Sequence, residues 1–153
     1  LRTGRIEVGL ACGPVDALGI TARVLREERF VAALPRRHAL AKLTAVPLRR
    51  LAGEPFVAVR PDVEPAWAGA CERALLRARV RLEVVQETDS KIALLGLVAA
   101  RVGCAIVSES MRHLARDGVV YRDIVGLDVR VPLVGLLTDS PSPRARAFFD
   151  AAI

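Results

Sequence analysis

Short apolar runs alternate with stretches of helical periodicity over the middle of the chain. Three runs, Phe56–Val59, Arg81–Val85 and Cys104–Val107, are four or five residues long and lie between Gly, Pro or charged residues, a pattern typical of strands. A helical stretch separates each run from the next. The order therefore predicts a βαβαβ unit, and with it a mostly parallel sheet that has helices on both faces.

The first of these helices is predicted over Ala66–Ala78. Trp67, Cys71 and Leu75 recur there at intervals of four, and together with Leu76 they form one apolar side. This side is expected to pack against the sheet.

The second helix begins at a polar group, Thr88, Asp89 and Ser90, whose side-chain oxygens are suited to accept from the free amides of a first turn. From Ile92 onward it is apolar on nearly every side, which predicts that it is buried. Gly103 is expected to end the helix in the left-handed conformation, which glycine adopts without a steric penalty.

The N-terminal part is predicted to be β-rich. A strand is expected at Ile6–Leu10, and two antiparallel strands at Ile20–Leu25 and Arg29–Leu34, joined by the charged turn Arg26–Glu28. Leu1 to Gly4 has the pattern of a last helical turn, which indicates that part of the protein lies upstream. Three further helices are expected: Leu48–Ala52 with Pro47 at its first position, Ser108–Ala115 and Pro143–Ala152. Two further strands are expected at Val119–Arg122 and Val129–Leu137.

Composition narrows the class of protein. A chain of 153 residues with 52% hydrophobic content can bury a core as one domain or two small lobes. No apolar run reaches the length of a membrane span, so no membrane association is expected. The net charge of +6 comes almost entirely from 21 arginines. Because they are scattered singly or in pairs, direct DNA binding by this segment is not favoured.

The residues that could carry chemistry are dispersed. Cys12, Cys71 and Cys104 are odd in number and far apart, so neither a disulfide pair, a metal site nor another cofactor is predicted. They are consistent with reduced thiols in the cytoplasm. His38 and His113 stand in separate polar turns without a neighbouring nucleophile, and we interpret them as ordinary surface histidines. We therefore predict no catalytic residues and no enzyme.

A small-ligand site is predicted where strands of a parallel sheet end. Arg60 and Pro61 follow one strand, and the polar group Thr88–Ser90 follows the next, at a helix start whose amides favour anions. Cys12 and Gly13 follow the N-terminal strand and are expected to join them. Each residue has a structural alternative: Arg60 could pair with Asp62, the polar group could only cap its helix, and Cys12 and Gly13 could be buried for packing.

Five segments in a fixed order carry a family resemblance: LRTGRIEVGL, ERFVAALPRRHALA, VPLRRLAGEPFVAV, LVAARVGCAIVSES and VPLVGLLTDSPSPRARAFF. Over its whole length the chain resembles the effector-binding (substrate-binding) domain of LysR-type transcriptional regulators. The resemblance implies an α/β, periplasmic-binding-protein-like type 2 fold of two lobes. Residues 1–32 would form part of lobe I, 33–121 lobe II, and 122–153 the return to lobe I, with crossover hinge strands near Phe30–Leu34 and Val119–Asp123.

The resemblance also implies a function. A small-molecule effector, a carboxylate or another anion, would bind in the cleft between the lobes and shift the conformation of attached DNA-binding domains. The effector-contacting residues would be those of the predicted site: Arg60, Pro61, Thr88, Asp89, Ser90, Cys12 and Gly13. The N-terminal DNA-binding domain and the start of lobe I would lie upstream of Leu1, and the protein would be a cytoplasmic homo-oligomer, a dimer or a tetramer. The alternative is a solute-binding protein of a transport system, which shares this fold.

Overall fold

A computed structural model describes residue 1 and residues 3–152. The chain divides into two compact units: unit 1 comprises Leu1–Glu28 and Val131–Ile153, and unit 2 comprises Arg29–Arg130. The chain leaves unit 1 within one long strand and returns to it at the start of another. No helix in the described part of the chain is long and apolar enough to cross a lipid bilayer.

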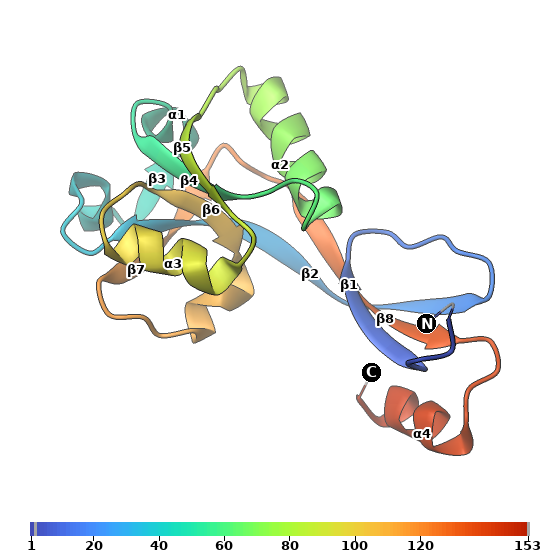
Figure 1. Ribbon diagram of the computed structural model, residues 1–153. Helices are drawn as coiled ribbons and strands as arrows, with labels where there is room; N and C mark the ends of the chain where they lie inside the picture. The colour runs from blue at the N-terminus through green and yellow to red at the C-terminus, as the bar shows by residue number, and fades with distance from the viewer. Residues whose placement is uncertain (2, 153) are drawn as a thin grey trace. The chain divides into compact units, whose positions relative to one another are not determined.

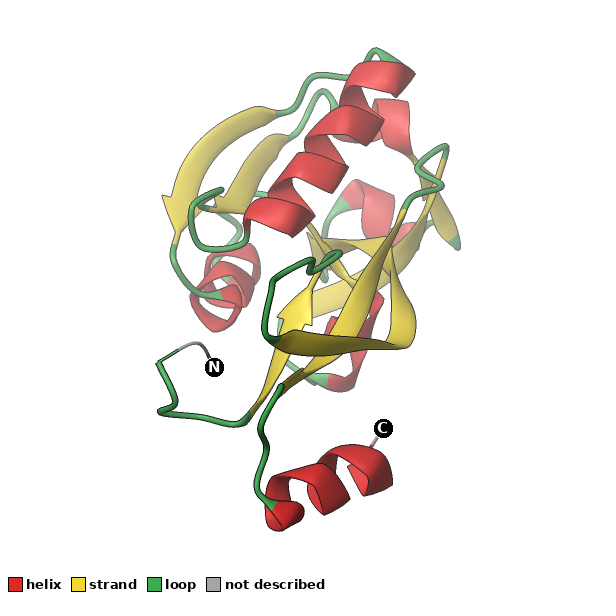
Figure 2. Ribbon diagram, turned by 90° about the vertical axis from the view of Figure 1, so that its right-hand side faces the viewer, coloured by secondary structure: helices red, strands yellow, loops and turns green. Residues whose placement is uncertain are grey.

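Unit 1 combines strands with a C-terminal helix, α4 (Pro143–Ala152), which has the predicted bounds. Strand β1 (Val8–Cys12) runs antiparallel to β8 (Arg130–Thr138). The helix begins after Ser142, whose hydroxyl accepts a hydrogen bond from the amide of Ala145 at 3.2 Å, and Figure 2 shows the loop that leads into it. Phe149 of α4 is fully buried against Leu137 and Ala145, so this helix face supplies the core of the unit.

Strand β2 (Ile20–Pro35) is one continuous strand of 16 residues, so the prediction of two strands joined by a turn was wrong. Charged residues at positions 26–28 interrupt the apolar pattern, but they do not demand the positive φ angles that a tight hairpin turn needs. Glu28 is only 5% exposed and pairs with Arg26 within the extended strand. The strand thereby contributes residues to both units (Figure 1).

Unit 2 contains the predicted βαβαβ unit. Strands β4 (Pro55–Val59) and β5 (Glu83–Thr88) are parallel and are joined by α2 (Pro65–Ala78). Helix α3 (Lys91–Ala99) leads from β5 to β6 (Ala105–Ser108), and Figure 1 shows this order of elements. A parallel bridge between Phe56 and Cys104 joins β4 to the residue that precedes β6.

The remaining pairings make the fold mixed. The second half of β2 is antiparallel to both β6 and β7 (Val119–Val125), whereas β3 (Ala45–Pro47) is parallel to β7. Residues 119–123, expected as a crossover, pair with Val31–Pro35 inside unit 2. Short helices complete the unit: η1 (Ala39–Lys42), α1 (Leu48–Leu51) and η2 (Glu109–His113). Pro47 is the residue before α1 rather than its first position.

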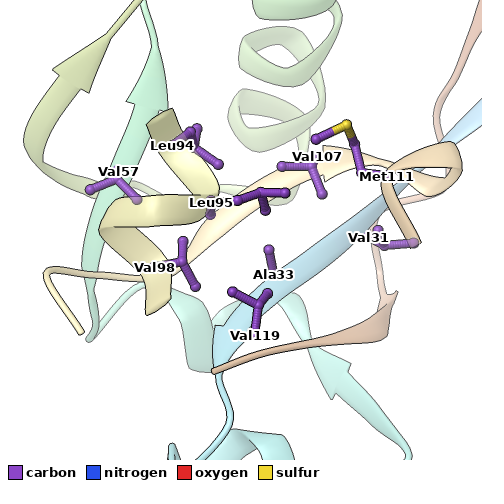
Figure 3. Close-up of a cluster of buried hydrophobic side chains, with 10 residues drawn as sticks. Val31, Ala33, Val57, Leu94, Leu95, Val98, Val107, Met111 and Val119 are labelled. Atoms are coloured by element: carbon purple, nitrogen blue, oxygen red, sulfur yellow. The ribbon is translucent and has the colours of Figure 1, made fainter. Parts of the chain in front are cut away.

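The core of unit 2 lies beneath one face of α3. Leu94, Leu95 and Val98 are at most 2% exposed and, as Figure 3 shows, they face side chains of the strands such as Ala33 and Val107. Ile92 on the same helix is 68% exposed. The prediction of a helix buried on nearly every side was therefore wrong, because one face of α3 suffices to close the core. Leu76 of α2, predicted inward, is also exposed, and Ala70 and Ala74 pack inward beside Trp67.

The end of α3 departs from the prediction in its chemistry. The left-handed residue is Arg101, with φ 64°, and Gly103 has no positive φ. The amide of Val102 donates to the carbonyl of Leu97 at 3.0 Å, as it does in a Schellman ending. Gly103 is needed for a different reason: a Cβ there would lie 2.6 Å from the carbonyl oxygen of Pro55.

Candidate ligand-binding site

The carboxyl ends of β4 and β5 bring the two central parts of the predicted site together. Val59 pairs with Thr88 in the parallel register, and the amide of Arg60 donates to the carbonyl of Thr88 at 2.9 Å. Pro61 continues from Arg60, and Ser90 begins α3 two residues after Thr88. Five of the seven predicted residues therefore share one end of the strands in unit 2.

The guanidinium of Arg60 is engaged by Asp62. Its Nε donates to Oδ1 at 3.0 Å and its Nη2 donates to Oδ2 at 2.7 Å, and both side chains are exposed. This bidentate bond lowers the pKa of Asp62 and raises the pKa of Arg60. Exposed pairs contribute little to stability, so a ligand carboxylate could replace Asp62 at small cost.

Ser90 is the cap of α3. Its Oγ accepts from the amides of Ile92 at 3.2 Å and Ala93 at 3.4 Å, and its own amide donates to Oγ1 of Thr88 at 3.3 Å. Asp89 between them is exposed. Because Ser90 already satisfies the first free amides, the helix start offers fewer donors to an anion than the sequence indicated.

An apolar groove with a volume of about 400 Å³ adjoins these residues and lies within unit 2. Pro61, Glu87 and Lys91 line it at the carboxyl ends of β4 and β5. Its remaining lining is mostly apolar and comes from α2, from the strands and from α3; it includes Phe56, Trp67, Leu75, Val80, Leu94 and Val107. This volume and lining are typical of sites for small organic molecules.

One charged pair lies among the apolar residues of this groove. Nζ of Lys91 is 2.9 Å from Oε1 of Glu64 and 5.6 Å from the ring centroid of Trp67. Both charged side chains are about a quarter exposed, and Oε2 of Glu64 is buried without a hydrogen-bond partner among the described residues. Sequence reasoning missed all three residues, because α2 and the start of α3 are separate in sequence and meet only in the fold.

Cys12 and Gly13 belong to unit 1, apart from the other five predicted residues in the chain's division. Cys12 is the last residue of β1. Gly13 is buried, has φ 92°, and its amide donates to the carbonyl of Pro132 at 2.7 Å. The positive φ and the bond to β8 give Gly13 a role in the turn that follows β1.

The other residues that could carry chemistry, two cysteines and a histidine, have structural roles. Burial raises the pKa of Cys71 to about 11 and that of Cys104 to about 12, so both thiols stay protonated at neutral pH. His38 is half-buried, caps η1 and bonds to Glu54 at 3.1 Å, so the interpretation of an ordinary surface histidine was wrong for this residue. Among the described residues, no three His, Cys, Asp or Glu side chains are grouped as metal ligands.

An α/β fold with an apolar groove that reaches the carboxyl ends of parallel strands defines a class of small-molecule-binding domains. The chain belongs to the LysR substrate binding domain family, whose model matches residues 1–153. It is 31% identical over 153 residues to the HTH-type transcriptional regulator TfdS of Cupriavidus pinatubonensis, a match that covers 99% of this chain and 52% of that protein. The chain spans about half the length of the curated relatives it matches.

Solved structures show the same fold. CbnR, a LysR family transcriptional regulator, superposes with a TM-score of 0.85 at 20% identity, over 99% of this chain and 52% of CbnR. The effector binding domain of QuiR in complex with shikimate has a TM-score of 0.83 at 17% identity, over 99% of this chain and 72% of that domain. These matches confirm the predicted type 2 periplasmic-binding-protein-like fold.

Proposed function

We propose that this chain is the effector-sensing part of a LysR-type transcriptional regulator. The groove between α2 and the strands β4 and β5 carries this proposal, since it offers a small molecule an apolar site inside a domain of that family. In the whole protein, DNA would be contacted by the helix-turn-helix part that gives relatives such as TfdS their name. The protein would act without catalysis, as a homo-oligomer in the cytoplasm.

The effector that fits best is an apolar or aromatic carboxylate. Lys91 would bind the carboxylate, because its ammonium carries three donors and faces a single acidic partner, Glu64. Trp67 and Phe56 would contact the apolar body. Arg60 would add a second cation if Asp62 releases it. The relative QuiR binds shikimate, which is itself a carboxylate.

Signalling requires that the effector prefer one conformation. A ligand that binds two conformations equally well shifts nothing, however tightly it binds. The predicted partners Thr88, Asp89, Ser90, Cys12 and Gly13 would supply this preference through contacts that differ between conformations. A solute-binding protein of a transport system would also bind a ligand here, but the curated relatives are transcriptional regulators, which favours the regulator.

The binding site is tested by thermal unfolding of the chain with benzoate, shikimate and, as a neutral probe, benzamide. We expect a carboxylate to raise the melting temperature; at a concentration of 100 Kd the stabilisation is about 2.7 kcal/mol. Lys91→Met should abolish this response. Lys42→Met is the matched control, because Lys42 is exposed on η1 and is the only other lysine. A carboxylate response that persists in Lys91→Met would exclude this groove as the site.

The regulatory role needs the complete gene product. We expect the same carboxylate to change the affinity of the complete regulator for DNA upstream of the regulator's own gene, or the stretch of that DNA that the regulator protects. Ligand binding in the chain without any effect on DNA binding would favour the transport alternative.

A further inference from the structure

A second cavity, with a volume of about 290 Å³, lies at the start of β4. It is lined by the end of β2 and residues that follow it, by the first residue of β4 and by residues that precede β6: Pro35, Arg37, His38, Pro55, Arg101, Val102, Gly103 and Cys104. Pro55 begins β4, whereas Pro61 of the groove follows its carboxyl end. The two sites share no lining residue, although Phe56 of the groove directly follows Pro55 of the cavity.

The cavity carries an excess of positive charge. Arg37 and Arg101 both line it and both are exposed. Within the described part of the chain, neither guanidinium forms an ion pair or a hydrogen bond. Other arginines of unit 2, such as Arg29 and Arg112, do have carboxylate partners.

The nearby carboxylate is already occupied by His38. The amide of Leu40 donates to Nδ1 of His38 at 3.2 Å, so Nδ1 carries no proton and the ring is the neutral Nε2–H tautomer. Nε2 therefore donates to Oε2 of Glu54 at 3.1 Å. The bond from His38 does not cancel the negative charge of Glu54, but the two arginines together outweigh this single carboxylate and leave an excess of positive charge that attracts an anion.

Arg101 is held in a conformation that is costly for its residue type. It has φ 64° at the position after α3 where glycine is usual. A left-handed backbone costs a non-glycine residue about 1–2 kcal/mol. In this conformation the residue lies at the lining of the cavity.

We propose that this cavity is a second ligand site, which binds a small molecule through a phosphate group. The guanidinium groups of Arg37 and Arg101 match the charge of a phosphomonoester, which is close to −2 at neutral pH, and each can donate two parallel hydrogen bonds to it. Pro35, Pro55 and Val102 supply apolar surface for the organic part of the ligand. The site is independent of the carboxylate groove and goes beyond the effector role proposed for that groove.

Arg101→Gly tests the proposal, with Arg79→Gly as the matched control. Arg79 is also an exposed, left-handed arginine after a helix, with φ 54°, but it is not among the residues of this cavity. Both changes remove one positive charge and relieve the same backbone strain, so both variants should fold and melt at or above the wild-type temperature without ligand. Arg37→Met tests the second arginine.

The probe is glycerol 2-phosphate, and its binding is measured by calorimetric titration at constant ionic strength. Glycerol and sodium chloride are titrated in the same way as controls for the organic part and for the ions. We expect the phosphate to bind wild type and Arg79→Gly with the same Kd, and Arg101→Gly and Arg37→Met at least tenfold more weakly. Equally weak binding to Arg79→Gly would show that the phosphate responds only to the net charge of the protein, which would contradict a site in this cavity. Absence of binding to wild type up to 10 mM would also overturn the proposal. The carboxylate response of the groove should be unchanged in Arg101→Gly, which separates failure of this site from failure of the proposed function.

Discussion

Gly103 lies against the backbone of Pro55 so closely that no side chain fits between them. A Cβ on Gly103 would be 2.6 Å from the carbonyl oxygen of Pro55 and 2.9 Å from its carbonyl carbon. The same carbonyl accepts a hydrogen bond from the amide of Cys104 at 2.8 Å, and the carbonyl of Cys104 accepts one from Val57 at 2.8 Å. The contact therefore joins β4 to the start of β6, at the second cavity that both residues line.

Gly103→Ala should lower the free energy of unfolding by about 1–3 kcal/mol, the usual cost of overpacking a rigid contact. The carbonyl of Pro55 cannot move aside without breaking its bond to Cys104. The measurement is urea unfolding followed by circular dichroism. Gly53→Ala is the control, because a Cβ on Gly53 meets no atom within 4 Å. Equal midpoints for the two variants would show that the backbone relaxes at position 103.

Ser90→Ala should lower the free energy of unfolding by about 1 kcal/mol, because α3 loses the cap on the amides of Ile92 and Ala93. Ser90→Asp restores an acceptor at the same place and should recover most of the loss. Ligand effects at this position must therefore be measured relative to each variant's own melting temperature. Unchanged stability in Ser90→Ala would mean that water replaces the hydroxyl fully.

Arg122→Lys should destabilise unit 2 by about 1–3 kcal/mol, because part-buried carbonyls lose their donors. The Arg122 guanidinium donates to the carbonyls of Ala41 at 2.7 Å, Leu43 at 2.7 Å and Tyr121 at 2.8 Å, which ties the segment around η1 to β7. A single ammonium cannot reach all three. Arg144→Lys on the exposed side of α4 is the control for the loss of a guanidinium. Similar unfolding midpoints in both variants would contradict this role for Arg122.

Stability should fall at alkaline pH, in part through Cys71. Burial raises its pKa from the ordinary value of 9.0 to about 11, so the folded state holds the thiol proton more tightly than the unfolded state. The contribution is complete below pH 9.0 and is lost as pH rises through about 11. Within this window the free energy of unfolding should fall by up to about 1.4 kcal/mol for each pH unit.

Cys71→Ala should flatten this dependence. Urea unfolding of both proteins at pH 8, 9, 10 and 11 under reducing conditions gives the two slopes, and their difference cancels the titration of other groups. Parallel slopes would show that Cys71 does not ionise differently in the two states.

Local patterns predicted most of unit 2. The period of four in Trp67, Cys71 and Leu75 located α2 to within one residue, and the polar group at Thr88–Ser90 located the start of α3. Helix caps, hydrophobic periodicity and the positions of proline all depend on residues that are close along the chain. The family resemblance, confirmed over residues 1–153, assigned the fold without structural information.

The sequence failed where distant segments decide the outcome. Nothing local distinguishes a charged turn at Arg26–Glu28 from a continuous strand, and only pairing with partners far along the chain keeps β2 extended. Likewise, a glycine after a helix is usually predicted to be its left-handed cap. Here Arg101 has that conformation, and position 103 needs glycine because the backbone of Pro55 leaves no room for a side chain.

By itself, therefore, the sequence determined the order of strands and helices from β4 to β6 and the polar cap within Thr88–Ser90, because each follows from residues within one or two turns of one another. It also determined the family, through five segments in a fixed order. Only the tertiary structure decided which charges meet. Lys91 reaches Glu64 across 27 positions, and Arg37 and Arg101 line one cavity across 64. The chemistry of a side chain determines what that residue can bind, but packing in three dimensions determines which residues lie close enough to act at one site.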